Sequence, residues 1–296
     1  MRGVAAVTGA SGYLGSRIAR RLTADGWHVI RLVRRPREVD PDERPYDLEG
    51  PVHPDLLLSV DVLVHAAYDF SVTARRDIWR VNVGGTQTLL RAARAAGTRR
   101  ILVLSTMSAY DGTRQLYGQA KLAIEAAAVA AGGCAIRPGL VYGSAPGGMT
   151  GSLRRLTRLP VTPLVAPNAH QYPVHEDDLV AAIAALADAD RLPVGPIGVA
   201  QPIPVRFKDL LIALAAADGR RCRFLPVPWQ LVYWGLRAAE LLRVHVPFRA
   251  DSLLGLVRPA PFVPGVDVLE SLGVHLQQFE SYVGGARPTV VGLSDE

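Results

Sequence analysis

The chain has 296 residues, of which 49% are hydrophobic and 20% are charged. This length suits one large α/β unit, or a nucleotide-binding core with a smaller appendage, and the apolar content is enough to bury a sizeable core. The formal net charge is +6, but the 33 Lys and Arg residues are spread along the chain without an aromatic-interleaved basic stripe. We therefore expect no nucleic-acid partner.

Membrane and secretory proteins are also disfavoured. No stretch approaches the roughly 20 apolar residues that span a bilayer, and the nearest one, 229–242, is interrupted by Arg237 and Glu240. The N-terminus leads directly into an apolar strand and a glycine turn, unlike a signal peptide. Cys134 and Cys222 are too few for a disulfide framework. We expect a cytoplasmic protein without a membrane span.

Short apolar runs alternate with helical stretches in the first half of the sequence. The runs are long enough to be strands buried on both faces, at residues 3–8, 28–33, 62–65, 101–105 and 134–137. Helical spacing of Ala, Leu and Ile occurs between them, at 16–25, 81–96 and 117–130. This alternation predicts an α/β fold with a doubly wound parallel sheet, the Rossmann architecture, covered by helices on both faces.

The pattern loosens in the second half, where residues 143–167 are rich in Gly, Pro and Arg. A helix is expected at 177–186, with Asp177 or Asp178 near its N-cap. Further strands are expected at 197–200 and 223–227, helices at 207–217, 229–242 and 267–272, and then a mobile tail. We interpret 1–142 as a nucleotide-binding core and 143–296 as a smaller substrate-binding lobe, with 171–200 returning to the core.

A glycine-rich turn, Thr8-Gly9-Ala10-Ser11-Gly12-Tyr13-Leu14-Gly15, separates the first strand from the first helix. Glycines at this place let the backbone approach a pyrophosphate, whose charge is favoured by the free N–H groups of the helix N-terminus. Three glycines alone are a weak signal, but the strand–turn–helix context predicts dinucleotide binding. The cofactor contacts expected in the turn are Gly9, Ser11, Gly12, Tyr13, Leu14 and Gly15.

The end of the second strand indicates which dinucleotide binds. A carboxylate there binds the ribose 2′-hydroxyl of NAD, whereas an arginine accommodates the 2′-phosphate of NADP. The strand is followed by Arg34 and Arg35, and no acid occurs before Glu38. We therefore expect Arg34 and Arg35 to contact the cofactor and favour NADP(H), with NAD(H) and a merely solvated basic turn as the alternatives.

Further motifs follow the glycine turn in order. They are Asp61-Val62-Leu63-Val64-His65-Ala66-Ala67, Val81-Asn82-Val83-Gly84-Gly85-Thr86, Leu104-Ser105-Thr106 with Tyr110, Tyr117-Gly118-Gln119-Ala120-Lys121, Arg137-Pro138-Gly139-Leu140-Val141-Tyr142-Gly143 and Val174-His175-Glu176-Asp177-Asp178-Leu179. Together with the turn they resemble the extended short-chain dehydrogenase/reductase family, also called the NAD-dependent epimerase/dehydratase family. The resemblance implies further cofactor contacts at Asp47, Leu48, Ala66, Ala67, Tyr117, Lys121 and Pro138.

Tyr117 and Lys121 suit the chemistry of ketone reduction. A phenol exchanges its proton poorly at neutral pH, but a nearby ammonium stabilises the phenolate and lowers the pKa of the phenol. Four residues of one helix separate them, which puts both side chains on the same face. The resemblance adds Thr106 as the hydroxyl that orients the substrate carbonyl. We expect Thr106, Tyr117 and Lys121 to be catalytic.

Four nearby features are less decisive. Two of them have a functional and a structural interpretation, and the other two are expected to be structural. Ser105 is an alternative to Thr106, although a buried strand hydroxyl is the more ordinary interpretation. Asn82 resembles the asparagine that holds a proton-relay water in related enzymes, and a structural role at the helix entry is equally open. Cys134 is expected in the core. The acidic run at 175–178 is expected to cap a helix, and no metal site is expected.

The resemblance includes epimerases, dehydratases and ketone reductases. Dehydratases follow the catalytic Thr with Asp-Glu, whereas this chain has Met107 and Ser108, so we reject dehydration. Leu140 stands where many sugar-nucleotide enzymes carry Asn, Gln171 stands in a region where they often place Arg, and the segment 143–173 is short. These departures favour a small or hydrophobic ketone, as in the dihydroflavonol reductases and 3β-hydroxysteroid dehydrogenases that residues 8–34 resemble.

We therefore expect an NADPH-dependent oxidoreductase that reduces a ketone, or oxidises the corresponding alcohol, with Tyr117 as proton donor. A nucleotide-sugar epimerase or 4-ketoreductase is the first alternative. A catalytically silent assembly subunit is the second, although such proteins typically lose the Tyr or the Lys. A small-molecule substrate is expected, and a homodimer is compatible with the sequence.

Overall fold

The computed structural model describes residues 2–37, 39–144, 147–242, 244 and 248–279. The tail expected to be mobile continues into 280–296, which lie outside the described residues. The chain divides into two compact units. Within the described residues, the first comprises 2–138, Glu176–Val199 and Val263–His275, and the second comprises Gly139–His175, Ala200–Phe262 and 276–279.

The first unit contains a seven-stranded parallel sheet in the order β11-β6-β5-β4-β1-β2-β3. Its strands are β1 (Val4–Thr8), β2 (His28–Val33), β3 (Glu43–Pro45), β4 (Val62–His65), β5 (Arg100–Leu104), β6 (Cys134–Pro138) and β11 (Ile197–Val199). The central strands are almost entirely buried, as the apolar runs predicted. The expected doubly wound Rossmann sheet is confirmed.

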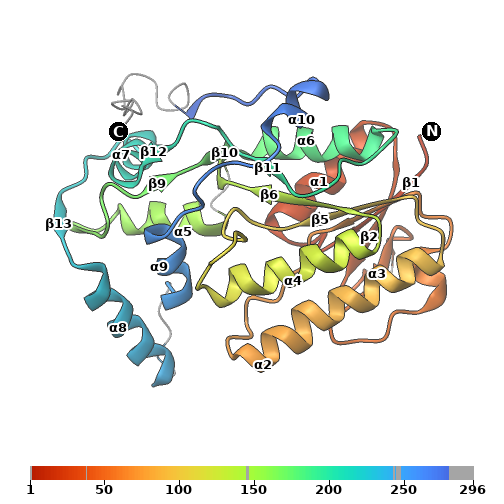
Figure 1. Cartoon of the computed structure of the whole chain (residues 1–296), viewed down its shortest axis with the longest axis horizontal. Coiled ribbons are helices and arrows are strands. Elements are labelled where there is room, and N and C mark those ends of the chain that lie inside the picture. The colour runs from red at the N-terminus through yellow and green to blue at the C-terminus, as the bar shows by residue number, and fades with distance from the viewer. Residues whose placement is uncertain (1, 38, 145–146, 243, 245–247, 280–296) are drawn as a thin grey trace. The chain divides into compact units, whose positions relative to one another are not determined.

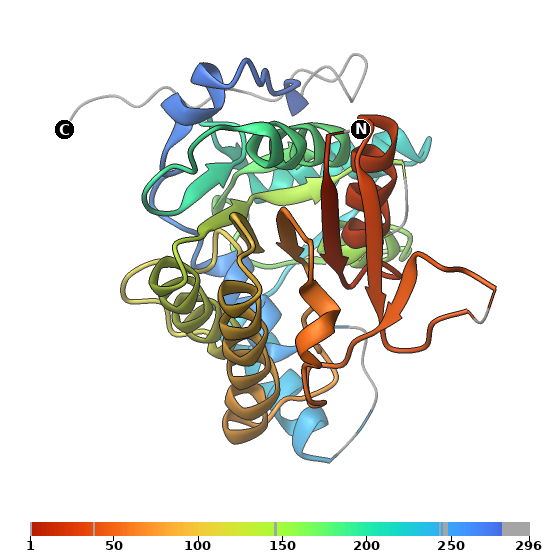
Figure 2. The ribbon, with the colours of Figure 1, turned by 90° about the vertical axis from the view of Figure 1, so that its right-hand side faces the viewer.

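Helices cover both faces of this sheet (Figures 1 and 2). On one side lie α1 (Tyr13–Ala24) and α6 (Glu176–Asp188), and on the other lie α3 (Gly85–Ala95) and α4 (Leu116–Ala130). The expected inward stripe of α1 is buried at Ile18, Ala19 and Leu22. The remaining helical elements are η1 (Pro54–Leu57), α2 (Arg75–Ile78), the π-helical η2 (Trp79–Gly84) and α10 (Val266–Ser271).

Several boundaries differ from the sequence-based expectations. The first helix begins at Tyr13 rather than at residue 16. Its first helical turn overlaps the glycine-rich motif, which has no helical pattern in the sequence. The helix expected at 81–96 is preceded without a break by α2 and η2, so helical structure begins at Arg75. Asp177 and Asp178 lie inside the first turn of α6, which begins at Glu176, and carboxylates are favourable there.

The second unit is built from four helices and three two-stranded pairings among its described residues. The helices are α5 (Gly148–Leu156), α7 (Phe207–Ala217), α8 (Trp229–Leu241) and α9 (Ala250–Val257). The strand pairs are β7 (Leu140–Tyr142) with β10 (Pro173–His175), β9 (His170–Gln171) with β12 (Val205–Arg206), and β8 (Thr162–Leu164) with β13 (Phe224–Pro226). The expected loosening at 143–167 is therefore partly wrong, because α5 and β8 form there around a core that contains Leu153 and Phe207.

None of the helices in the described part of the chain has the length and apolarity that crossing a membrane requires.

Candidate active site

The carboxyl ends of the central strands meet at one edge of the sheet. Thr8 ends β1 and pairs in register with Leu32 of β2 on one side and with His65 of β4 on the other. His65 in turn is opposite Val103 of β5. The strand order reverses at β1, and ligands of open α/β sheets bind in the crevice outside such a switch point.

The glycine turn at this crevice has the shape of a phosphate cradle. Gly9 has φ +65°, and a Cβ on it would lie 3.1 Å from the backbone nitrogen of Ala67. A Cβ on Gly15 would overlap the carbonyl oxygen of Gly9, to which the Gly12 N–H donates at 2.8 Å. Helix α1 begins at Tyr13 with neither a side-chain cap nor an acid in its first turn among the described residues. Its first N–H groups are suited to a pyrophosphate.

The side chain of Tyr13 takes a role that the sequence did not reveal. Its hydroxyl donates to Glu176 Oε2, and Glu176 Oε1 lies 2.8 Å from Arg17 Nη2. Burial and the bond to Glu176 raise the pKa of Tyr13. Glu176, the buried first residue of α6, therefore ties α6 to α1, and only the backbone of Tyr13 is suited to the expected cofactor contact.

Among the described residues, no group of three or more His, Cys, Asp and Glu side chains is arranged to hold a metal ion.

A buried chain of hydrogen bonds joins β1, β4 and α3. The hydroxyl of Thr86 donates to the Asn82 carbonyl at 2.6 Å, so it accepts from the Nε2–H of His65 at 2.9 Å. His65 Nδ1 then accepts from the Thr8 hydroxyl at 2.8 Å. Burial lowers the pKa of His65 to about 3, with a smaller contribution from the charge of Lys121. His65 is a neutral structural residue with both ring nitrogens bonded.

The same Thr8 hydroxyl fixes the start of the loop after β4. It accepts hydrogen bonds from the N–H groups of Ala66 at 3.0 Å and of Ala67 at 3.1 Å. These are the two alanines expected to contact the cofactor, and Ala67 lies against Gly9 of the glycine turn. The loop and the turn are thereby held together at the switch point.

Asn82 fixes the next part of this loop. Its Oδ1 accepts from the Asp69 N–H at 2.7 Å, and its Nδ2 donates to the Asp69 carbonyl at 3.1 Å. Asn82 is buried in the π-helical turn η2. The sequence left open a catalytic and a structural role for Asn82. These hydrogen bonds favour the structural role, in which Asn82 holds the backbone of the loop after β4.

Tyr117 and Lys121 lie together on the first turns of α4, as their spacing predicts. The Nζ of Lys121 is 5.8 Å from the centroid of the Tyr117 ring and donates to the Leu104 carbonyl, at the end of β5, at 2.6 Å. Lys121 is only 4% exposed. Burial lowers its pKa to about 7, against an opposing contribution from Glu125. The ammonium is therefore poised near neutrality beside the phenol.

The two hydroxyls after β5 differ in their surroundings. Ser105 is buried and donates to Glu125, which also receives two bonds from Arg137, at 2.8 and 2.7 Å. The partly buried Thr106 accepts from the Ser108 N–H at 3.2 Å, so its own proton is available for donation. The geometry favours Thr106 as the substrate-facing hydroxyl and gives Ser105 a structural partner, which is a side chain rather than the backbone.

The remaining expected cofactor residues lie around the same edge. Arg34 and Arg35 follow β2, are exposed, and have no hydrogen bond or ion pair with the described residues. The pKa of Asp69 lies below its usual range, mainly through hydrogen bonds from Ser71 and partly through the charge of Arg34. Arg34 is therefore on the side of β2 that faces the β4 loop.

The positions of Asp47, Leu48 and Pro138 say less about cofactor binding. The exposed Asp47 accepts from the Glu49 N–H at 3.0 Å, and Leu48 packs partly on the core with its carbonyl against Gly85. Pro138 ends β6 and accepts from the Met107 N–H at 3.1 Å.

Two aromatic residues at the site were missed in the sequence. Tyr68 and Phe70 follow β4, and their rings lie 5.0 and 5.7 Å from the Tyr117 ring. The Nζ of Lys121 is 4.8 Å from the centroid of Tyr68. The sequence shows only that the loop after β4 contains aromatic residues. It does not predict their contact with Tyr117, because they are nearly 50 residues away along the chain.

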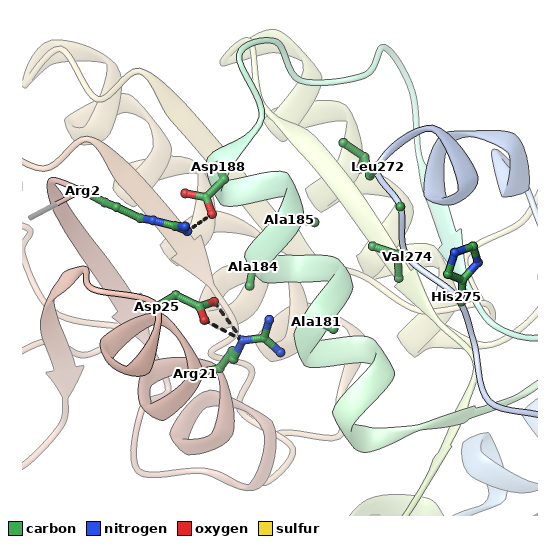
Figure 3. Close-up of a pocket in the computed structure, with 11 residues that line it drawn as sticks. Arg2, Arg21, Asp25, Ala181, Ala184, Ala185, Asp188, Leu272, Val274 and His275 are labelled. Carbon is green, nitrogen blue, oxygen red and sulfur yellow. Dashed lines mark hydrogen bonds and ion pairs between the residues drawn. The ribbon is translucent and has the colours of Figure 1, made fainter.

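A hollow of about 520 Å³ lies in the first unit, lined in part by the end of α1 (Figure 3). It is lined by the end of α1, the C-terminal half of α6 and the segment 272–275. Its arginines Arg2 and Arg21 are paired with Asp188 and Asp25. The hollow is near the amino end of β1, so it is separate from the crevice at the carboxyl ends.

The fold and the site together define a dinucleotide-binding enzyme of the short-chain dehydrogenase/reductase type. The sequence model of the NAD dependent epimerase/dehydratase family matches residues 5–196. The chain belongs to this family and is an enzyme of the oxidoreductase type.

Individual relatives carry different activities. A ceramide reductase of Caulobacter vibrioides (strain NA1000 / CB15N) is 31% identical over 241 residues, which cover 77% of this chain and 74% of the relative. A UDP-glucose 4-epimerase of Streptomyces lividans is 33% identical over 152 residues, 42% of this chain and 46% of the relative. The crystal structure of gox2253 superposes with a TM-score of 0.73 at 19% identity, covering 95% of this chain and 96% of that one.

Proposed function

We propose that the protein is an NADPH-dependent reductase of a ketone with a hydrophobic substituent, or catalyses the reverse oxidation of the alcohol. The observation that carries the proposal is the buried Lys121, held by the Leu104 carbonyl beside the Tyr117 phenol. The same unit contains the glycine turn, in which Gly9 and Gly15 let backbone segments pack closely before the uncapped N-terminus of α1, where a pyrophosphate is favoured.

Each of these side chains has a definite part in the reaction. Bound NADPH supplies a hydride to the carbonyl carbon. Tyr117 donates its phenolic proton to the carbonyl oxygen, and Thr106 hydrogen-bonds and polarises that oxygen. Lys121 stabilises the phenolate that remains. One ketone, one NADPH and one proton thus give one alcohol and one NADP⁺.

The preference for NADPH rests on Arg34 and Arg35. Both guanidinium groups are exposed and form no hydrogen bond or ion pair with the described residues, although the charge of Arg34 reaches Asp69. Both follow β2, where a 2′-phosphate would lie. The neighbouring Arg37 is different, because Glu43 and Asp40 already pair with it. A preference for NADPH agrees with a reductase, because a reductase consumes one NADPH in each turnover and must then release NADP⁺.

Three features support a hydrophobic substrate. Leu140 cannot donate a hydrogen bond to a nucleotide sugar, and it packs partly against the core of the second unit. The amide of Gln171 donates to the Leu256 carbonyl at 2.8 Å and carries no charge for a diphosphate. The similarity to a ceramide reductase supports a reduction with a lipid-like substrate.

The test offers the protein NADPH with a panel of hydrophobic ketones and 4-keto nucleotide sugars. The absorbance of reduced nicotinamide and the mass of the product are followed together. A product heavier by two hydrogens, with one NADPH consumed for each molecule formed, supports the proposal.

A nucleotide-sugar epimerase is the second candidate, which the similarity to the UDP-glucose 4-epimerase favours. It predicts an isomer of unchanged mass, no net loss of NADPH, and protein that purifies with its cofactor bound. That outcome overturns the reductase. A silent subunit would convert no compound of the panel, and the presence of both Tyr117 and Lys121 argues against it.

A further inference from the structure

Tyr68 and Phe70 form an aromatic pair beside the proposed proton donor. Their ring centroids are 4.8 Å apart with an interplanar angle of 49°. Tyr68 meets the Tyr117 ring edge-on at 87°, and Phe70 lies beside the same ring at 38°. The three rings therefore form one aromatic cluster that includes the ring of Tyr117.

Phe70 is the part of this cluster that faces outward. Its side chain is 62% exposed, although the loop that bears it is anchored at several points. A phenylalanine that is exposed and also held against a catalytic ring is suited to contact a ligand, because a bound hydrocarbon would remove its apolar face from water.

The backbone between the two rings is fixed in advance. Asp69, which separates Tyr68 from Phe70, has both its N–H and its carbonyl bonded to the side chain of Asn82. The Asp69 carboxylate accepts from the Ser71 N–H at 2.8 Å. A surface that is already ordered loses little conformational entropy when a ligand binds to it.

The charges at the surface are already engaged. Lys121 donates to the Leu104 carbonyl and lies over the face of Tyr68. The carboxylate of Asp69 is bonded to Ser71 and lies within reach of the charge of Arg34, which the proposed function assigns to the cofactor phosphate. A diphosphate would require cationic partners, whereas a hydrocarbon requires only the aromatic faces.

We propose that the aromatic pair is a subsite for the hydrocarbon substituent attached to the reacting carbonyl, and that Asn82 is its positioning residue. This inference rests on the proposed function, since it assumes that the carbonyl lies at Tyr117. Phe70 then sets the preference for long apolar substituents, and Tyr117 and Lys121 set the rate of the chemistry.

The experiment measures binding of a series of unbranched methyl ketones of increasing chain length by equilibrium dialysis in the presence of NADP⁺, so that no turnover is needed. The wild type is compared with Phe70→Ala and Phe70→Leu. Phe262→Ala is the matched control, because Phe262 is a similarly exposed phenylalanine, at 66%, in the second unit. Melting temperatures and NADPH titrations establish that each variant is folded.

We expect affinity to rise with chain length in the wild type and in Phe262→Ala. Phe70→Ala should lose about tenfold in affinity for the longest ketone and little for the shortest, and Phe70→Leu should retain most of the preference. Asn82→Ala should lower the same preference and raise KM more than it lowers kcat. An unchanged chain-length dependence in Phe70→Ala overturns the inference, as does a wild type that binds UDP-glucose more tightly than any ketone.

The two proposals fail in different ways. If long ketones bind through Phe70 but none is reduced, the proposed reductase fails, and only the binding of hydrocarbon by the aromatic pair stands. If ketones are reduced with NADPH but Phe70→Ala behaves as the wild type, the reductase stands and the subsite fails.

Discussion

The carboxyl ends of β4 and β2 border the same crevice but are built on opposite principles. After β4, Thr8, His65 and Asn82 bind the backbone and one another in a buried network. After β2, Arg34 and Arg35 are exposed and form no hydrogen bond or ion pair with the described residues. One region holds its groups in a single arrangement, and the other presents charge that is free to reorganise.

The difference matches what each region is proposed to do. Proton transfer depends on placing a hydroxyl within hydrogen-bond reach of one oxygen, which requires rigid support. Recognition of a 2′-phosphate requires only a guanidinium that can reach it, and long side chains supply this from the surface. Tyr117 and Lys121 of α4 contact the loop after β4 at Tyr68. Substitutions in this rigid part of the site should therefore have larger effects than substitutions after β2.

The largest effect is expected for Tyr117→Phe. Loss of the phenolic proton should lower kcat by about 10²–10⁴, because this is the usual contribution of a positioned general acid. The melting temperature and the NADPH affinity should change little, since the ring contacts with Tyr68 and Phe70 remain possible. Steady-state kinetics on the ketone identified by the panel provides the measurement, and near wild-type turnover would contradict the mechanism.

Lys121→Met should impair both turnover and NADPH binding, which separates it from Tyr117→Phe. The substitution removes the buried ammonium that contacts the Leu104 carbonyl and the Tyr68 ring, and the family resemblance implies that it also touches the ribose. Paired fluorescence titrations and rate measurements test this. A variant with normal NADPH affinity would restrict Lys121 to the proton transfer.

His65→Gln should alter the dependence of stability on pH. In the folded protein the pKa of His65 is about 3, against an ordinary value of 6.5, so the unfolded chain binds a proton that the folded chain does not. This contribution to stability is complete above pH 6.5 and is lost as the pH falls toward 3, with an upper bound of about 5 kcal/mol.

Urea unfolding at several pH values between neutrality and about pH 4 measures the effect. His65→Gln should be less stable than the wild type at neutral pH, and its free energy of unfolding should fall less steeply with acid. Carboxylates contribute equally to both proteins, so the difference between the two slopes isolates His65. Parallel slopes would show that His65 is not neutral in the fold.

The smallest effect is expected on the β2 side. Wild-type protein should bind NADPH at least about tenfold more tightly than NADH, equivalent to about 1.4 kcal/mol, and Arg34→Ala should remove most of this preference. Arg37→Ala is the matched control, because Arg37 is occupied by Glu43. Equal affinities in the wild type would remove the basis for NADPH and return the epimerase to first place.

The parts of the fold that the sequence predicted well share one physical property. β2 and β4 have the expected bounds because strands buried on both faces are continuous apolar runs. The short strands β3, β9 and β12 were missed, since pairs of two or three residues depend on the partner strand rather than on their own side chains.

The candidate site divides along the same line. Local patterns revealed the glycine turn and the four-residue spacing of Tyr117 and Lys121. Two hydrogen bonds could not be predicted: that between Asn82 and Asp69, and that between Tyr13 and Glu176. Each joins residues that only the folded sheet brings together. The contact of Phe70 with Tyr117 belongs to this second group.

The buried hydrogen-bond network from Thr8 to Asn82 is also poorly suited to proton transfer. Each hydrogen along it, from the Ala66 N–H through Thr8, His65 and Thr86 to the Asn82 carbonyl, already has an assigned acceptor. A proton cannot pass along the network unless both hydroxyls and the imidazole reverse their donors together, and protonation of His65 is strongly disfavoured. If Tyr117 donates a proton in each turnover, as we propose, that proton must be resupplied by a route other than this network.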